Sequence, residues 1–158
     1  MAKRNLPIGI EFYKKVIDEA YFYVDKTLII KELLDRQSYV NLFTRPRRFG
    51  KTLALDMLKT FFEDEIDEKG NAVDNSKYFA DKKIMDAGNQ YIQHMGRYPV
   101  IYLSFKSSKQ ADWDTTFWMI KKQIAEEYIR HQYVLQTDDL LEVEKNLYRS
   151  IMSLADDN

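Results

Sequence analysis

Residues 39–52 read Tyr39-Val40-Asn41-Leu42-Phe43-Thr44-Arg45-Pro46-Arg47-Arg48-Phe49-Gly50-Lys51-Thr52, and this stretch decides the expected fold. Its first six residues are rich in β-formers and end at a loop that contains a proline, so they predict a strand. The apolar residues that follow recur at i, i+3, i+4 and i+7, which predicts a helix beginning near Lys51: they are Ala54, Met57, Leu58 and Phe61. Strand, loop and helix in this order are the context that a phosphate-binding loop requires.

The end of the loop matches the Walker A pattern G-x-x-x-x-G-K-[ST]. Gly50 would let the backbone approach the phosphates, Lys51 would reach the β- and γ-phosphates, and the Thr52 hydroxyl would ligate Mg²⁺. The first glycine of the pattern is replaced by Arg45, and Pro46 offers a different way to fix the turn. The residues expected to bind a nucleotide, ATP with Mg²⁺, are Arg45, Pro46, Arg47, Arg48, Phe49, Gly50, Lys51 and Thr52.

The three arginines of the loop leave a second hypothesis open. Arg45, Arg47 and Arg48 could contact phosphates or a neighbouring subunit, or they could be solvated or salt-bridged. The alternative to nucleotide binding is therefore a non-catalytic interaction module, or a fragment that contacts nucleic acid through this loop. A compact loop with inward-pointing N–H groups would support the nucleotide, and an extended arginine ribbon would support the alternative.

The rest of the chain alternates strand and helix patterns. Val100–Ser104 is the second predicted strand, and Asp25 is a plausible N-cap for a helix that carries Ile30, Leu33 and Leu34. Further helices are expected at 11–18 and 81–94. Two apolar stripes near the C-terminus predict long helices packed into a core: Trp113, Phe117, Ile120, Ile124 and Tyr128, then Leu140, Val143, Leu147, Ile151 and Leu154. Strands flanked by helices indicate an α/β fold with a parallel sheet.

Composition excludes several classes of protein. The chain has 158 residues, 24 Lys and Arg against 25 Asp and Glu, and a formal net charge of −1, so it lacks the global basic signature of a nucleic-acid binder. The absence of cysteine excludes a disulfide scaffold and a cysteine nucleophile. Neither a signal peptide nor an apolar run of membrane-spanning length is visible, so a soluble cytoplasmic protein is expected.

Several blocks of sequence resemble one known family. They are Leu6-Pro7-Ile8-Gly9-Ile10, Tyr23-Val24-Asp25-Lys26-Thr27, the loop Phe43–Thr52 and Tyr98–Lys106. They are similar to the AAA-ATPase-like domain at the N-terminus of bacterial proteins that often carry a PD-(D/E)xK nuclease-like domain as well. The resemblance implies a P-loop NTPase-like parallel sheet flanked by helices, a nucleotide partner and the use of Mg²⁺. It leaves self-association open, and it leaves the block at 23–27 as either a helix cap or a part of the nucleotide site.

Hydrolysis requires a second carboxylate site, usually an Asp that ends an apolar strand and is followed by a Glu. The apolar run Val100–Leu103 ends in Ser104 instead. The family that the chain resembles carries such a strand, ending in I-D-E-Y-D, further along than residue 158. Residues 1–158 are therefore expected to form the N-terminal portion of the domain, with the P-loop at 45–52, no Walker B region and an incomplete sheet. Enzymatic activity of this chain is left open.

Overall fold

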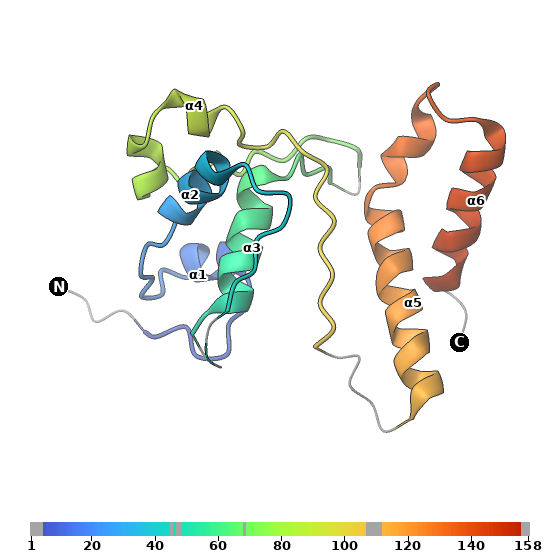
Figure 1. The fold of residues 1–158 in the computed structure, drawn as a ribbon, viewed down its shortest axis with the longest axis horizontal. Helices are drawn as coiled ribbons and strands as arrows, with labels where there is room; N and C mark the ends of the chain where they lie inside the picture. The colour runs from blue at the N-terminus through green and yellow to red at the C-terminus, as the bar shows by residue number, and fades with distance from the viewer. Residues whose placement is uncertain (1–4, 45, 47–48, 68, 107–111, 156–158) are drawn as a thin grey trace. The chain divides into compact units, whose positions relative to one another are not determined.

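The computed structural model describes residues 5–44, 46, 49–67, 69–106 and 112–155. The chain separates into two compact units, Met1–Val100 and Ile101–Asn158. Figure 1 shows the helices of each unit. The first unit contains α1 (Tyr13–Asp18), α2 (Leu28–Arg36), α3 (Lys51–Phe62), η1 (Ser76–Tyr78), η2 (Lys83–Asp86) and α4 (Asn89–Ile92). The second contains α5 (Trp113–Arg130), η3 (Gln132–Gln136), α6 (Glu142–Met152) and η4 (Ser153–Ala155).

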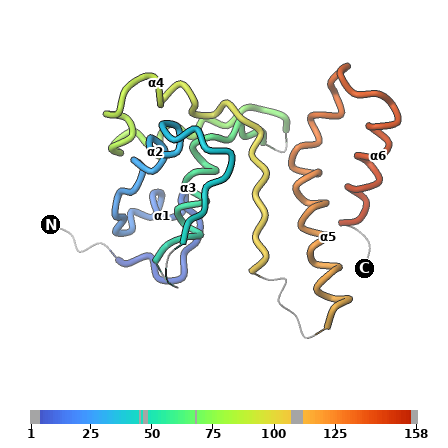
Figure 2. Tube along the Cα trace, in the orientation of Figure 1, coloured from blue at the N-terminus to red at the C-terminus, as the bar shows by residue number. Residues whose placement is uncertain are grey.

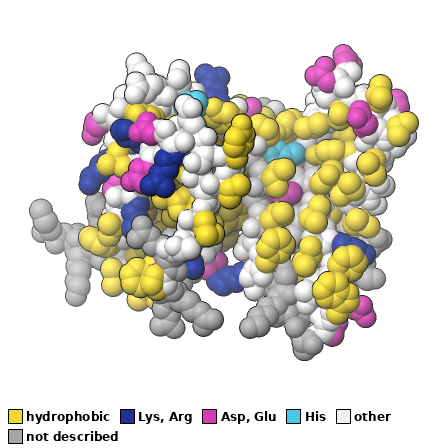
Figure 3. Space-filling model, in the orientation of Figure 1, with side chains coloured by type: hydrophobic (Ala, Val, Ile, Leu, Met, Phe, Trp, Pro, Cys, Tyr) yellow, Lys and Arg dark blue, Asp and Glu magenta, His cyan; other side chains and the backbone are white. Residues whose placement is uncertain are grey.

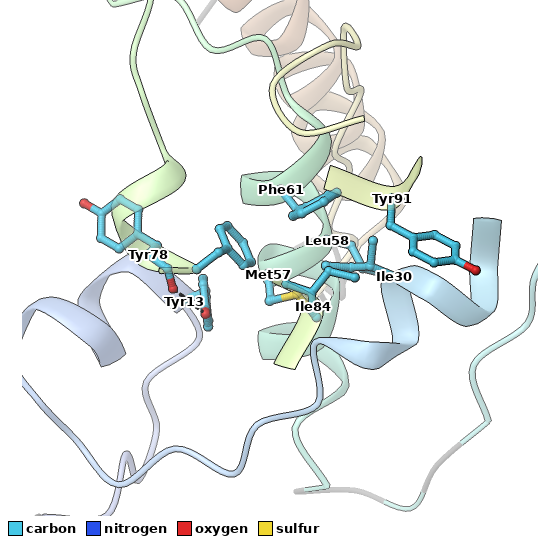
Figure 4. Packing of buried hydrophobic residues seen from close by; sticks show 9 residues of the cluster. Tyr13, Ile30, Met57, Leu58, Phe61, Tyr78, Ile84 and Tyr91 are labelled. Carbon is cyan, nitrogen blue, oxygen red and sulfur yellow. Dashed lines mark hydrogen bonds between the residues drawn. The ribbon is translucent and has the colours of Figure 1, made fainter. Parts of the chain in front are cut away.

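Helix α3 supplies the centre of the first unit's core. The helix begins at Lys51, as the apolar spacing predicts, and Met57, Leu58 and Phe61 form its buried face. Figure 4 shows these side chains among those of the surrounding elements. The cluster is completed by Tyr13 from α1, Ile30 from α2, Tyr78 and Phe79 around η1, Ile84 from η2 and Tyr91 from α4. Among the described residues, five short helices thus pack against the apolar face of α3.

The C-terminal end of α3 is capped by a segment distant in sequence. The Gly96 N–H donates to the Phe61 carbonyl at 2.8 Å, and the Arg97 and Tyr98 N–H groups donate to the Phe62 carbonyl at 3.0 and 2.9 Å. The last carbonyls of a helix have no intrahelical partner, so these bonds satisfy groups that would otherwise need water. The cap fixes where α3 ends and ties residues 96–98 to it.

The second unit is a helical hairpin with little buried apolar surface. Helices α5 and α6 run antiparallel and pack side by side (Figure 1), and the Tyr148 hydroxyl donates to the Tyr128 carbonyl at 2.9 Å. Asp112 caps α5 by accepting from the Thr115 N–H at 2.8 Å. Ala125 is the buried apolar residue of this hairpin within the described residues.

The predicted burial of the two C-terminal stripes is largely wrong, although the two helices themselves are confirmed. Trp113 is 70% exposed, Val143 78% and Leu147 62%. Figure 3 shows apolar side chains gathered on the visible surface of this unit. An amphipathic pattern indicates which face of a helix is apolar, but not whether another element covers that face.

The predicted α/β fold with a parallel sheet is also wrong. Within the described residues there are only two isolated bridges, Glu63 with Tyr98 and Ile66 with Ala72. The expected strands Tyr39–Thr44 and Val100–Ser104 follow extended traces outside any ladder (Figure 2). Val40 and Leu42 are 84% and 85% exposed, so no layer packs on them. Apolar β-formers make a strand only where a neighbouring strand pairs with them and another layer of the protein buries their side chains.

The helix expected at 81–94 is broken into two short pieces, η2 and α4. Gly88 separates them with φ +117°, a left-handed value that ends the helical backbone at this point. The two pieces carry the core residues Ile84 and Tyr91 separately, and this geometry lets both side chains reach the same cluster.

Candidate functional site

The N-terminus of α3 is the candidate functional site. Gly50 is its N-cap, with φ +71° and ψ +29°, and its carbonyl accepts the first intrahelical bond from the Ala54 N–H at 2.9 Å. The N-cap residue is a glycine and so has no side chain to cap this end of the helix. The N–H groups of the first turn have no acceptor within a helix, and the helix dipole adds a partial positive charge there. Such an end is suited to an anion.

Gly50 has a conformation that an L-residue adopts at a cost. A Cβ at this position would meet no atom within 4 Å, so the cost is one of backbone conformation and not of collision. We expect Gly50→Ala to lower the free energy of unfolding by about 1–2 kcal/mol, and Gly50→Asn to lower it less, because asparagine tolerates left-handed φ. Urea denaturation of the three proteins would measure the difference, and equal stability of Gly50→Ala and wild type would refute the left-handed assignment.

The structure brings together only part of the predicted phosphate loop. Phe49, Gly50 and Lys51 are exposed and Thr52 is half-buried in the first turn of α3. Pro46 is exposed as well, while Arg45, Arg47 and Arg48 lie outside the described residues. The expected helix after the loop is thus confirmed, the expected strand before it is not, and the shape of the loop stays a prediction.

Asp56 is a buried carboxylate on α3 that sequence reasoning missed. Its Oδ2 accepts a 2.6 Å hydrogen bond from the Tyr13 N–H at the start of α1. Burial raises the pKa of Asp56, although this hydrogen bond and the nearby ammonium of Lys59 oppose the rise. This hydrogen bond joins α1 to α3, and Asp56 lies one helical turn after Thr52. The local pattern held no signal for this role, because Asp56 lies outside the apolar stripe of Ala54, Met57, Leu58 and Phe61.

Asp25 acts as a structural link at the start of α2. The N-cap of α2 is Thr27, two residues after the predicted position, but Asp25 Oδ1 accepts from both the N–H and the hydroxyl of Thr27, at 2.8 and 2.7 Å. Asp25 Oδ2 accepts from the Lys83 N–H at 2.8 Å, at the start of η2. Thr27 is fully buried and its Oγ1 accepts from the Ile84 N–H at 3.2 Å. The prediction of Asp25 as the N-cap is wrong, and Asp25 instead links the start of α2 to the start of η2.

Removing Asp25 should therefore destabilise the first unit. Burial favours the neutral acid, but the hydrogen bonds from Lys83 and Thr27 outweigh it and hold the pKa of Asp25 below its ordinary value. A lowered pKa gives stability that is present above the unfolded pKa and is lost as the pH falls through the folded one. We expect Asp25→Ala to cost on the order of 2 kcal/mol at neutral pH, and less below about pH 4.

Urea denaturation of Asp25→Ala at neutral and at acid pH tests this role. The control is Glu32→Ala, which removes an exposed carboxylate from the surface of α2 and should leave stability within about 0.5 kcal/mol. A loss no greater for Asp25→Ala than for Glu32→Ala at neutral pH would contradict the role as a link.

The described residues contain neither a metal-binding cluster nor a membrane-spanning helix. Within the ranges that the structure describes, no three His, Asp or Glu side chains are grouped so that they could hold a metal ion by themselves. Among the described helices, none combines the length and the apolar character needed to cross a membrane.

Comparison with known proteins identifies the family. A family model described as predicted AAA-ATPase matches residues 7–157. An uncharacterized protein in the vnfD 5′ region of Azotobacter chroococcum mcd 1 is 43% identical over 63 residues, a stretch that covers 39% of this chain and 12% of that relative. No solved structure matches the chain. Because the family match covers nearly the whole sequence, the chain belongs to the family of predicted AAA-ATPases.

Proposed function

We propose that the chain binds ATP with Mg²⁺ at the N-terminus of α3. The observation that carries the proposal is Gly50 in left-handed conformation immediately before Lys51 and Thr52, at a helix end whose N-cap residue has no side chain. The first-turn N–H groups would donate to the phosphates, and the exposed Lys51 would neutralise their charge. Membership of a predicted AAA-ATPase family supports a nucleotide as the anion.

The residues present fit both parts of the ligand. Among the described residues, no atom apart from those of Gly50 and its chain neighbours lies within 4 Å of a Cβ built at Gly50, which supports room for a phosphate beside the backbone. Mg²⁺ keeps several waters and takes most of its other ligands from the nucleotide phosphates, so one protein ligand, the Thr52 hydroxyl, is enough to place it. When bound, the metal would offset the negative charge of the phosphates.

Calorimetric titration of the 158-residue chain with Mg-ATP tests the proposal. We expect saturable binding that is weak, because the site described here consists of one helix end and two side chains. Inorganic triphosphate with Mg²⁺ should compete, since the predicted contacts are all to phosphates. Absence of binding for both ligands would overturn the proposal.

Binding should not lead to turnover by this chain. Hydrolysis needs a carboxylate that positions the metal and the attacking water, and three acidic side chains of the first unit that could be considered for this task have other contacts. Asp56 accepts a hydrogen bond from the Tyr13 N–H. Asp25 accepts from the Thr27 and Lys83 N–H groups, and Asp18 accepts from the Tyr78 hydroxyl at 3.2 Å. We expect phosphate release from Mg-ATP to equal that of a Lys51→Ala control. Steady release above the control would show that a catalytic carboxylate exists in the chain.

A further inference from the structure

A small cavity of about 250 Å³ opens beside α1 in the first unit. It shares no residue with Gly50–Thr52 and serves no purpose in phosphate binding. Pockets for drug-sized ligands have volumes of roughly 300–1,000 Å³, so this cavity suits a molecule with a single ring. One wall is apolar and consists of Val16 and Ile17 from α1 and Ala20 from the turn after it.

Two tyrosines form the aromatic part of the cavity. Tyr23 packs edge-on against the buried ring of Tyr13, with 5.3 Å between ring centroids and 65° between ring planes. Burial raises the pKa of Tyr23 to about 12, so the phenol is neutral at physiological pH. Tyr21 lines the cavity as well and is half-buried. Neutral tyrosine rings attract organic cations through their negative faces.

The charged part of the cavity consists of two carboxylates and one ammonium, which leaves one net negative charge. Lys82 is only 8% exposed and its ammonium contacts the carboxylate of Asp81, whose side chain is 81% exposed. Asp25 also lines the cavity. A carboxylate can accept about four hydrogen bonds; among the described residues, Asp25 accepts two on Oδ1 and one on Oδ2. One acceptor position on Oδ2 remains for a ligand.

We propose that this cavity binds a small organic cation, an ammonium group carried on one apolar ring. The ring would pack between the apolar wall and the tyrosines, and the ammonium would be attracted by Asp25 and Asp81. An anion is disfavoured by the net charge. A neutral ring of the same size would keep the apolar contacts but lose the attraction.

The test is an NMR titration of the isotope-labelled 158-residue chain with benzylamine at neutral pH, where its amine is protonated. Benzyl alcohol and benzoate serve as the neutral and anionic analogues. We expect the backbone amides of Ala20, Tyr21 and Lys82 to shift with benzylamine, and to shift at roughly two- to fivefold higher concentration with benzyl alcohol, the factor that one partly exposed ion pair provides. Benzoate should produce the weakest response.

Asp81→Asn is the decisive variant, since the side chain is exposed and the amide oxygen of asparagine can still accept a hydrogen bond from the Lys82 ammonium. We expect its affinity for benzylamine to fall roughly two- to fivefold, while its affinity for benzyl alcohol stays as in wild type. Glu32→Gln removes the same charge outside the cavity and should leave both affinities unchanged. The proposal is overturned if benzylamine shifts other residues, if the three probes bind equally, or if Asp81→Asn binds benzylamine as wild type does.

Discussion

Lys51→Ala is expected to abolish the stabilisation of the chain by Mg-ATP while leaving the unliganded protein as stable as wild type. Lys51 is exposed, and surface substitutions of this kind change stability by about 0.5 kcal/mol or less. At a ligand concentration about five times Kd, binding adds about 1 kcal/mol, which raises the Tm of a unit of this size by roughly 4–8 °C. A thermal melt with and without Mg-ATP would show the rise in wild type and its loss in the variant.

The matched control for this experiment is Lys69→Ala. Lys69 is an exposed lysine of the same unit that lies outside the candidate site, so its loss should leave the effect of Mg-ATP intact. If Mg-ATP raised the Tm of Lys51→Ala as much as that of Lys69→Ala, Lys51 would not be the ligand of the phosphates.

Phe61→Ala is expected to destabilise the first unit strongly. Phe61 is fully buried and packs edge-on against Phe79 and Phe62, with centroid distances of 5.2 and 5.1 Å. Truncating a buried phenylalanine costs about 3–5 kcal/mol through lost burial and the cavity left behind. Domains of this size have only about 5–15 kcal/mol of stability in total, so the cooperative thermal transition should weaken strongly or disappear.

Phe12→Ala provides the comparison for Phe61→Ala. It removes the same atoms from a side chain that is 66% exposed, so we expect a change within about 0.5 kcal/mol. Circular dichroism melts of both variants would separate the two effects. A Phe61→Ala protein that melts like Phe12→Ala would contradict the placement of α3 at the centre of the core.

The helices could be predicted from the sequence because helical periodicity is a local signal. The spacing of Met57, Leu58 and Phe61 places α3 and its buried face correctly, and Ile30 does the same for α2. The prediction of a sheet was wrong, because strand formation depends on partners far away in the chain, and a local pattern does not show whether such partners exist. Tyr39–Thr44 has the composition of a strand, but the part of the chain that the structure describes provides no neighbouring strand for it.

In the candidate site, too, the features with a local pattern could be predicted from the sequence and those that depend on distant residues could not. Gly50, Lys51 and Thr52 stay predicted site residues from the motif, and only the helix behind them, predicted from local periodicity, is confirmed. The roles of Asp56 and Asp25 could not be found, because each depends on a partner distant in sequence: the Tyr13 N–H is 43 residues from Asp56, and the Lys83 N–H is 58 residues from Asp25. Buried polar side chains are positioned by such tertiary contacts, which no local pattern encodes.

The location of nucleotide binding is tested most directly by an NMR titration of the isotope-labelled chain with Mg-ATP, read at each backbone amide. The N–H groups at the start of α3 should donate to the phosphates, so the largest shifts are expected at Gly50, Lys51 and Thr52. The Lys51→Ala variant should show little change at the same concentrations. Shifts confined to residues away from the start of α3, or equal shifts in the variant, would contradict phosphate binding at this helix end.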